Sequence, residues 1–176
     1  MKTVAIVGSG VPFQTEKYNE VWANNNAYLS FAFRQLNKLF IMHKQHKKRG
    51  ELVYDWGDIA IKAKQNGFQV ITLHDILELP DRVAYPYEEI VRMFDTDYFA
   101  STICYQIAYA LYQGFSTIGF YNLGHFSGVS DETDDLNERC GEEYWIGRAS
   151  QLASVYVDKT CDYLTTTTGL PYAIKG

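Results

Sequence analysis

Short apolar segments alternate with amphipathic ones along most of the chain. The first, TVAIV at residues 3–7, is a continuous apolar run rich in β-branched residues, which is typical of a parallel strand buried on both faces. Further segments with strand character follow it, most of them bounded by glycine, asparagine or charged residues. Together the predicted strands lie at residues 3–7, 21–28, 36–43, 68–73, 116–123 and 154–158.

The stretches between these strands have the spacing of helices. Residues 54–66 carry apolar side chains near helical spacing and are followed by Gly67, a typical C-terminal stop. Residues 97–113 repeat apolar side chains at i, i+4 and i+8, with Asp97 as the expected cap and Gly114 as the end, and should form the best buried helix. Shorter helices are predicted at 87–94 and 142–152, and loops at 79–86 and 124–141.

Strands that alternate with helices at this spacing predict right-handed βαβ units and therefore a mainly parallel sheet. The expected fold is a three-layer, Rossmann-like α/β sandwich. A chain of 176 residues with 47% hydrophobic residues can bury one substantial core, and it is short for two domains. We therefore expect one domain over residues 1–176, with an irregular tail from about residue 161.

Charge and composition argue against several classes of function for this protein. The formal charge of −5 argues against sequence-independent binding to nucleic acid phosphates. No apolar stretch approaches the roughly 18 residues that span a bilayer, and the first residues lead directly into a strand, so we expect a cytosolic protein without membrane contact. Cys104, Cys140 and Cys161 share no C-x-x-C spacing and predict buried free thiols rather than a disulfide framework or a zinc site.

The first strand ends in Gly8-Ser9-Gly10, and in a parallel sheet the loop after the first strand lies where ligands bind. The two glycines permit close approach of the backbone to a ligand. The signal is weaker than a dinucleotide fingerprint, because Phe13 stands where G-x-G-x-x-G needs its third glycine and no Gly-Lys-Ser/Thr follows. The sequence is compatible with two interpretations of this segment, a ligand-binding loop and a plain strand-to-helix turn.

Polar residues at the other strand ends should gather at the same edge, beside helix N-termini that attract anions. We expect this edge to form the ligand crevice, with His43 as a candidate catalytic group. Each histidine taken alone is more typical of a surface or hydrogen-bonded structural residue, and the asparagines are more typical of a helix cap. The predicted ligand-binding residues are Gly8, Ser9, Gly10, Asn24, Asn26, His74, Asp75, Asn122, His125 and Arg148.

The predicted helix at 142–152 adds charged groups near this edge. Glu143 is a candidate catalytic residue, since its carboxylate can hold a ribose hydroxyl or act as nucleophile or general base, and Arg148 can pair with phosphate. The alternative is a capped surface helix with an ion pair. The acidic segment 131–135 offers oxygen ligands to a metal but departs from the EF-hand spacing, which favours a solvated loop. The sequence contains no serine-hydrolase elbow or zincin motif.

Several motifs occur in order along the chain: VAIVGSGVP, WANNN, LFIMH, YFAST, IGFYNLG, EEYWIGRA and SVYVD. In this combination the chain resembles phage-encoded Rossmann-like proteins that are distantly similar to 6-hydroxymethylpterin diphosphokinase-like proteins. The resemblance covers most of the chain and implies a phage origin and a nucleotide-type ligand. The helix at 142–152 also resembles the E-x-G-x-A helix of nucleoside deoxyribosyltransferases, although Trp145 stands two residues before Gly147, where that family has its glutamate.

A nucleotide-type site is compatible with two functions. One is a small nucleotide-binding protein that acts as a nucleotide or nucleoside transferase or as a glycosidic hydrolase. The other is a non-enzymatic binder that sequesters a host nucleotide signal or engages a host protein. For assembly, Tyr105, Tyr109 and Tyr112 form a stripe on the 97–113 helix, which predicts a homo-oligomer with this stripe in the contact. The alternative is that these tyrosines pack under the chain's own tail at 170–174.

Overall fold

The computed structural model describes residues 1–8, 17–25, 29, 36–43, 54–124 and 132–161, with only the backbone described at 132–135. Strands and helices alternate along these residues, as the sequence pattern predicts. In chain order the elements are β1 (Thr3–Val7), β2 (Glu20–Asn24), β3 (Lys38–Ile41), α1 (Trp56–Asn66), β4 (Gln69–Thr72), β5 (Val83–Ala84), α2 (Tyr87–Phe94), α3 (Thr102–Tyr112), β6 (Thr117–Tyr121), α4 (Glu132–Leu152) and β7 (Ser154–Val157).

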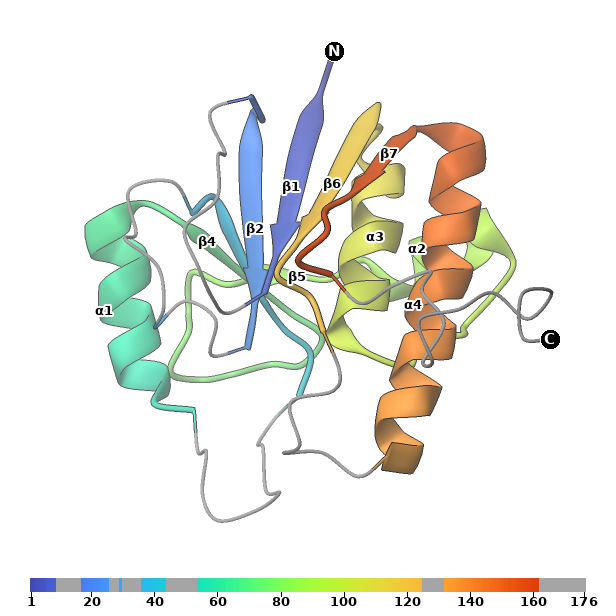
Figure 1. Cartoon of the computed structure of the whole chain (residues 1–176). Coiled ribbons are helices and arrows are strands. Elements are labelled where there is room, and N and C mark those ends of the chain that lie inside the picture. Colours follow the sequence, from blue (N-terminus) through green and yellow to red (C-terminus); the bar gives the residue numbers. More distant parts are fainter. Residues whose placement is uncertain (9–16, 26–28, 30–35, 44–53, 125–131, 162–176) are drawn as a thin grey trace, which may run out of the picture.

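Within the described residues, seven strands form one sheet in the order β5-β4-β3-β2-β1-β6-β7, and every neighbouring pair is parallel. Strand β1 lies inside the sheet, where Ile6 is in register with Trp22 of β2 and with Phe120 of β6. The chain first builds outward from β1 to β5 and then returns to add β6 and β7 on the other side (Figure 1). The prediction of a mainly parallel α/β sheet is confirmed.

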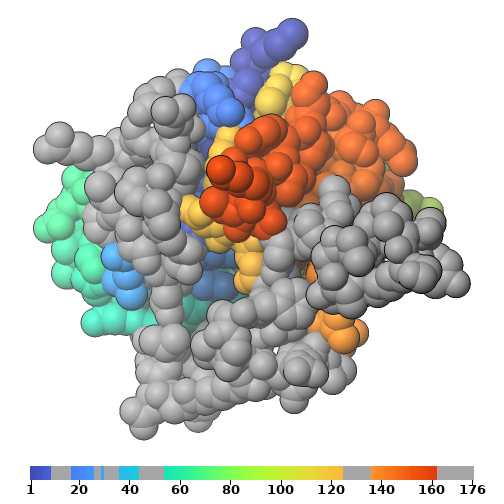
Figure 2. All heavy atoms as spheres, viewed as in Figure 1, coloured from blue at the N-terminus to red at the C-terminus, as the bar shows by residue number. Residues whose placement is uncertain are grey.

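Helices cover both faces of this sheet, which makes three layers. Helix α1 lies on one face, and α2, α3 and α4 lie on the other (Figure 1). Because strand side chains alternate, neighbouring residues of β1 enter different cores: Ile6 packs on the α3 side and Ala5 on the α1 side. Figure 2 shows β7 and the second half of α4 together on one face of the molecule.

Helix α3 is the most deeply buried helix among the described residues, with nine of its 11 residues buried. Its start differs from the prediction, because the cap is Ser101 rather than Asp97. The Ser101 backbone is extended, and its side chain accepts a hydrogen bond from the Ile103 N–H. Asp97 instead lies in an irregular turn, where its carbonyl accepts from the Phe99 N–H at 2.9 Å. Gly114 follows the helix with a φ of 72°, as a C-terminal stop requires.

Helix α4 begins ten residues earlier than predicted, at Glu132, so most of the expected loop at 124–141 is helical from that point. The early turns carry acidic residues without an apolar period, which conceals the helix from a hydrophobicity pattern. Negative charge near a helix N-terminus stabilises it, and Arg139 and Glu143 form an ion pair one turn apart. Gly141 lets α4 approach the start of α3 closely, since a Cβ there would lie 2.6 Å from the Ala100 Cβ and 3.3 Å from Cys104 Sγ.

Smaller differences concern elements that depend on distant contacts. The two-residue strand β5 falls inside the predicted loop at 79–86, and the Tyr85 N–H extends its pairing to the Thr72 carbonyl at 2.9 Å. Strand β2 ends at Asn24 rather than at residue 28. Cys104 and Cys161 are buried as expected, but Cys140 is exposed. The predicted tail from about residue 161 lies almost wholly outside the described residues.

The tyrosine stripe on α3 belongs largely to the protein's own core. Tyr109 is only 7% exposed and packs against Trp22 and Phe40 at ring-centroid distances of 5.6 Å. Tyr105 stacks on Phe99 at 4.4 Å. The prediction that this stripe forms an oligomer contact is therefore wrong for Tyr109, whose ring is already covered. An oligomeric state stays a prediction, and the tail at 170–174 lies outside the described residues.

Candidate functional site

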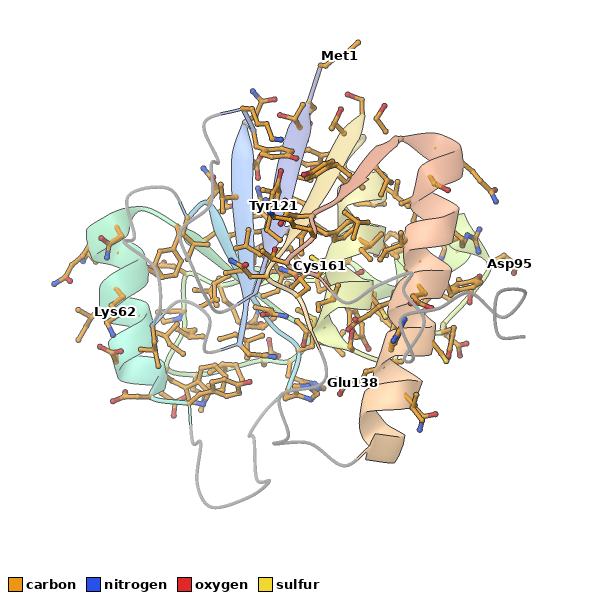
Figure 3. All side chains as sticks on the ribbon, in the orientation of Figure 1. Met1, Lys62, Asp95, Tyr121, Glu138 and Cys161 are labelled. Atoms are coloured by element: carbon orange, nitrogen blue, oxygen red, sulfur yellow. The ribbon has the colours of Figure 1, made fainter. Side chains whose placement is uncertain are left out.

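The seven described strands run in one direction, so their carboxyl ends meet at one edge, at the lower end of the strands in Figure 1. The strand order reverses between β1 and β6, because β1 leads into β2 on one side while β6 joins it from the other. Open α/β sheets bind ligands outside the carboxyl ends at such a reversal. Gly8 follows β1 here, and Asn122 follows Tyr121, the residue that ends β6 and is labelled in Figure 3.

Gly8 and Asn122 are in direct contact. The Gly8 N–H donates to the Tyr121 carbonyl at 3.0 Å, and a Cβ at position 8 would lie 2.1 Å from the Asn122 carbonyl oxygen. Asn122 itself adopts a left-handed φ of 51°, and its N–H donates to Thr160 Oγ1 at 3.0 Å. The close approach of two backbones therefore requires glycine at position 8, whether or not a ligand binds there.

An open cavity of about 650 Å³ lies at the ends of β3 and β4, beside the start of α1. Its volume is within the range of small-molecule sites. Three predicted site residues, His43, His74 and Asp75, come together here from two different strand ends. The cavity is lined by Met42, His43, Trp56, His74, Asp75, Ile76, Leu77 and Glu78.

The cavity offers hydrogen-bond acceptors more than positive charge. Its described lining residues include the acidic side chains of Asp75 and Glu78 but no lysine or arginine, and Asp75 forms an ion pair with Arg82. The neighbouring N-terminus of α1 is already capped, because Asp55 accepts from the Asp58 N–H at 2.9 Å. N–H and O–H donors of a ligand therefore find acceptors among the described lining residues.

The end of β2 is tied to the start of α1 by an interaction that the sequence did not suggest. Tyr54 donates its hydroxyl to Asn25 Oδ1 at 3.0 Å, and Asn25 has a left-handed φ of 46°. Burial raises the pKa of Tyr54 to about 12, so this hydroxyl stays a neutral donor. Asn24, a predicted ligand residue, is half-buried at the end of β2. The predicted residues Ser9, Gly10, Asn26 and His125 lie outside the described part of the chain.

Glu143 and Arg148 on α4 do not line the cavity. The Arg139 Nε donates to Glu143 Oε1 at 2.9 Å, so the candidate catalytic carboxylate is held in an ion pair on its own helix. The Arg148 guanidinium donates to the Tyr144 hydroxyl at 2.9 Å and lowers its pKa. The same group lies over the ring of Trp145 at 5.7 Å. These contacts match the interpretation of α4 as a surface helix with an ion pair.

A buried polar cluster joins α3 to α4. Glu142 is 0% exposed and accepts a hydrogen bond from the Ser101 hydroxyl, which also caps α3. Cys104 Sγ lies 3.6 Å from the same hydroxyl. Burial raises the pKa of the Cys104 thiol to about 11, which leaves little reactive thiolate at neutral pH. We interpret this cluster as a structural link between the helices, and no local sequence signal identifies it.

No family model, curated protein or solved structure matches this chain. Within the described residues, no helix is long and apolar enough to cross a membrane. The described side chains also contain no group of three or more histidine, cysteine or acidic residues placed to hold a metal ion. The geometry of the carboxyl edge is therefore the basis for assigning a function to this protein.

Proposed function

We propose that this protein binds a nucleotide or a nucleotide-derived ligand at the carboxyl edge of its sheet. The observation that carries the proposal is the cavity of about 650 Å³, which gathers His43, His74, Asp75 and Trp56 from three separate elements. The cavity lies at the carboxyl edge of a parallel sheet, where such folds bind ligands, although at the ends of β3 and β4 rather than at the reversal between β1 and β6. The motif resemblance to phage-encoded Rossmann-like proteins supports the same ligand class.

The chemistry of the cavity favours the base or the sugar as the part that enters. Trp56 and the two histidines provide rings on which a planar base can stack. Asp75 and Glu78 provide acceptors for N–H and O–H groups. The described lining residues include no lysine or arginine, so the contacts they offer suit a base or a sugar rather than a phosphate.

Thermal unfolding in the presence of nucleotides tests the proposal. A ligand at about 100 times its Kd adds roughly 2.7 kcal/mol of stability, which raises the unfolding midpoint measurably. His74→Ala should remove most of this shift, because His74 lines the cavity. Arg148→Ala is the matched control, since Arg148 lies outside it, and should keep the shift. The proposal fails if no nucleotide raises the wild-type midpoint, or if His74→Ala binds as well as wild type.

One observation favours a binder without catalytic activity over a transferase or glycosidic hydrolase. The candidate nucleophile Glu143 is paired with Arg139 and does not line the cavity, so it does not meet the candidate catalytic residue His43. We therefore propose that the protein sequesters a nucleotide rather than converting it. Recovery of the bound nucleotide after long incubation distinguishes the two: intact ligand supports sequestration, and turnover by a small amount of protein supports an enzyme.

A further inference from the structure

A second cavity, of about 320 Å³, lies between the C-terminal half of α1 and residues 79–82, which lead into β5. It shares no described lining residue with the cavity at the carboxyl edge. The two cavities border one continuous segment, because residues 75–78 line the first and residues 79–82 line the second. An ion pair between Asp75 and Arg82 joins the two ends of this segment. The second cavity is therefore a separate concave surface on the α1 side of the sheet.

The interior of the second cavity is apolar. Phe68, Val70 and Leu79 line it and are 5%, 4% and 4% exposed, as part of the core beneath α1. On the α1 wall, the side chains of Ala60 and Ala63 are small and leave room for a ring. An apolar cavity of roughly 150 Å³ holds benzene. A volume of about 320 Å³ therefore fits a ring of that size together with a short polar head.

The charged residues that line this cavity have both signs. Lys64 and Arg82 are cationic, and Asp81 is anionic. Gly67, the C-cap of α1, also lines the cavity, and the partial negative charge at a helix C-terminus attracts a cation. Because Arg82 already pairs with Asp75, Lys64 is the stronger candidate to bind a carboxylate. A ligand with one group of each sign thus finds a partner for both.

We infer that the second cavity binds a free hydrophobic amino acid of about the size of phenylalanine. The ring enters the apolar interior and packs against Phe68 and Leu79. The carboxylate pairs with Lys64, and the ammonium group lies toward Asp81 and the C-terminal end of α1. A neutral apolar molecule leaves these charges without a partner, and a nucleotide places polar groups against an apolar interior. The inference does not depend on nucleotide binding at the carboxyl edge.

Calorimetric titration with a series of related compounds tests the recognition. Phenylalanine should bind most tightly, and phenylalaninamide and 3-phenylpropionate, which lack the carboxylate and the ammonium group, should each bind about threefold more weakly. Benzyl alcohol lacks both charges and should bind more weakly still. Absence of phenylalanine binding at millimolar concentration overturns the inference. Equal affinity for benzyl alcohol overturns it too, and equal affinity for N-acetylphenylalaninamide would indicate a site for a peptide side chain instead.

A filling substitution on α1 tests the location. Ala63→Phe places a ring inside the cavity and should abolish phenylalanine binding, whereas Gln65→Phe adds the same ring on an exposed position that does not line the cavity and should leave binding unchanged. Unfolding midpoints of both variants show whether the fold is retained. Normal phenylalanine binding by a folded Ala63→Phe variant would overturn the assignment.

A charge substitution at the exposed Lys64 tests the carboxylate contact without a risk to the core. Lys64→Gln should weaken binding of phenylalanine and 3-phenylpropionate about threefold and leave binding of phenylalaninamide unchanged. Lys62→Gln is the matched control, since Lys62, labelled in Figure 3, pairs with Asp58 and does not line the cavity. Equal weakening of all three compounds by Lys64→Gln, or equal effects of the two variants, would contradict the inference.

Discussion

The carboxyl edge is built differently in its two halves. In the closed half, around Gly8, Tyr121 and Asn122, two strand ends are hydrogen-bonded and leave no room for a side chain at position 8. In the open half, around His43, His74 and Asp75, the ends of β3 and β4 border a cavity of about 650 Å³. A glycine after the first strand can thus serve the packing of two strand ends alone, so such a glycine does not by itself mark the ligand site.

The largest expected effect comes from Gly8→Ala in the closed half. A Cβ there would lie 2.1 Å from the Asn122 carbonyl oxygen, a backbone atom held in place by the sheet. Overpacking of this kind costs about 1–3 kcal/mol, and a backbone clash belongs at the upper end. Urea unfolding measures the loss.

Gly147→Ala is the control for this prediction. A Cβ at position 147 on α4 meets no atom within 4 Å, so the substitution should stabilise the helix by up to about 1 kcal/mol. Equal free energies of unfolding for the two alanine variants would contradict the packing assigned to the closed half.

Ser101→Ala should have the next largest effect. Ser101 caps α3 and also donates to the fully buried Glu142, so the variant loses a cap and leaves a buried carboxylate with one donor fewer. We expect a loss of about 2–3 kcal/mol in the free energy of unfolding. Asp55→Ala removes an exposed cap from α1 beside the open half and should cost only about 1 kcal/mol. Similar losses in the two variants would show that Glu142 does not depend on Ser101.

Tyr54→Phe tests the link between β2 and α1. Loss of the hydrogen bond to Asn25 should cost about 1 kcal/mol at neutral pH. The pKa of Tyr54 is raised to about 12 in the folded protein, while the unfolded chain ionises near its ordinary value of about 10. Wild type should therefore lose stability as pH rises from about 10 to about 12, and the phenylalanine variant should lose less. Urea unfolding below and above about pH 10 checks this, and parallel losses in both proteins would contradict it.

His74→Ala should have the smallest effect on stability. His74 is half-exposed at the rim of the cavity, and surface substitutions away from packed features change the free energy of unfolding by less than about 0.5 kcal/mol. His74→Ala should weaken nucleotide binding at the open half and should thus leave the free energy of unfolding in urea unchanged. A large loss of stability would mean that the histidine supports the fold, as Gly8 does in the closed half.

Local patterns were informative where a segment's own residues decide its structure. Val4, Ala5, Ile6 and Val7 are all 0% exposed, as a continuous apolar run predicts for a strand covered on both faces. Helix α1 ends at Gly67, whose φ is 75°, as its sequence signal indicates. The pattern failed for the start of α4, because charge and the helix dipole rather than an apolar period stabilise those turns.

The candidate site was only partly predictable, because its members come from separate elements. Strand ends placed His43, His74 and Asp75 at one edge, and the cavity joins these three. Arg148 was assigned to phosphate from its residue type and its predicted helix near this edge, whereas the structure puts its guanidinium over rings of α4 itself.

The sequence by itself determined the class of fold, because the period of apolar residues and the glycines that end helices act within a few residues of one another. Tertiary structure alone decided which polar residues meet. Strand order placed β6 against β1 and so made Gly8 a packing residue, and the approach of α3 buried Tyr109 in the core rather than at a surface. The physical reason is that hydrogen-bond satisfaction and close packing depend on contacts between segments about a hundred residues apart, which no local pattern records.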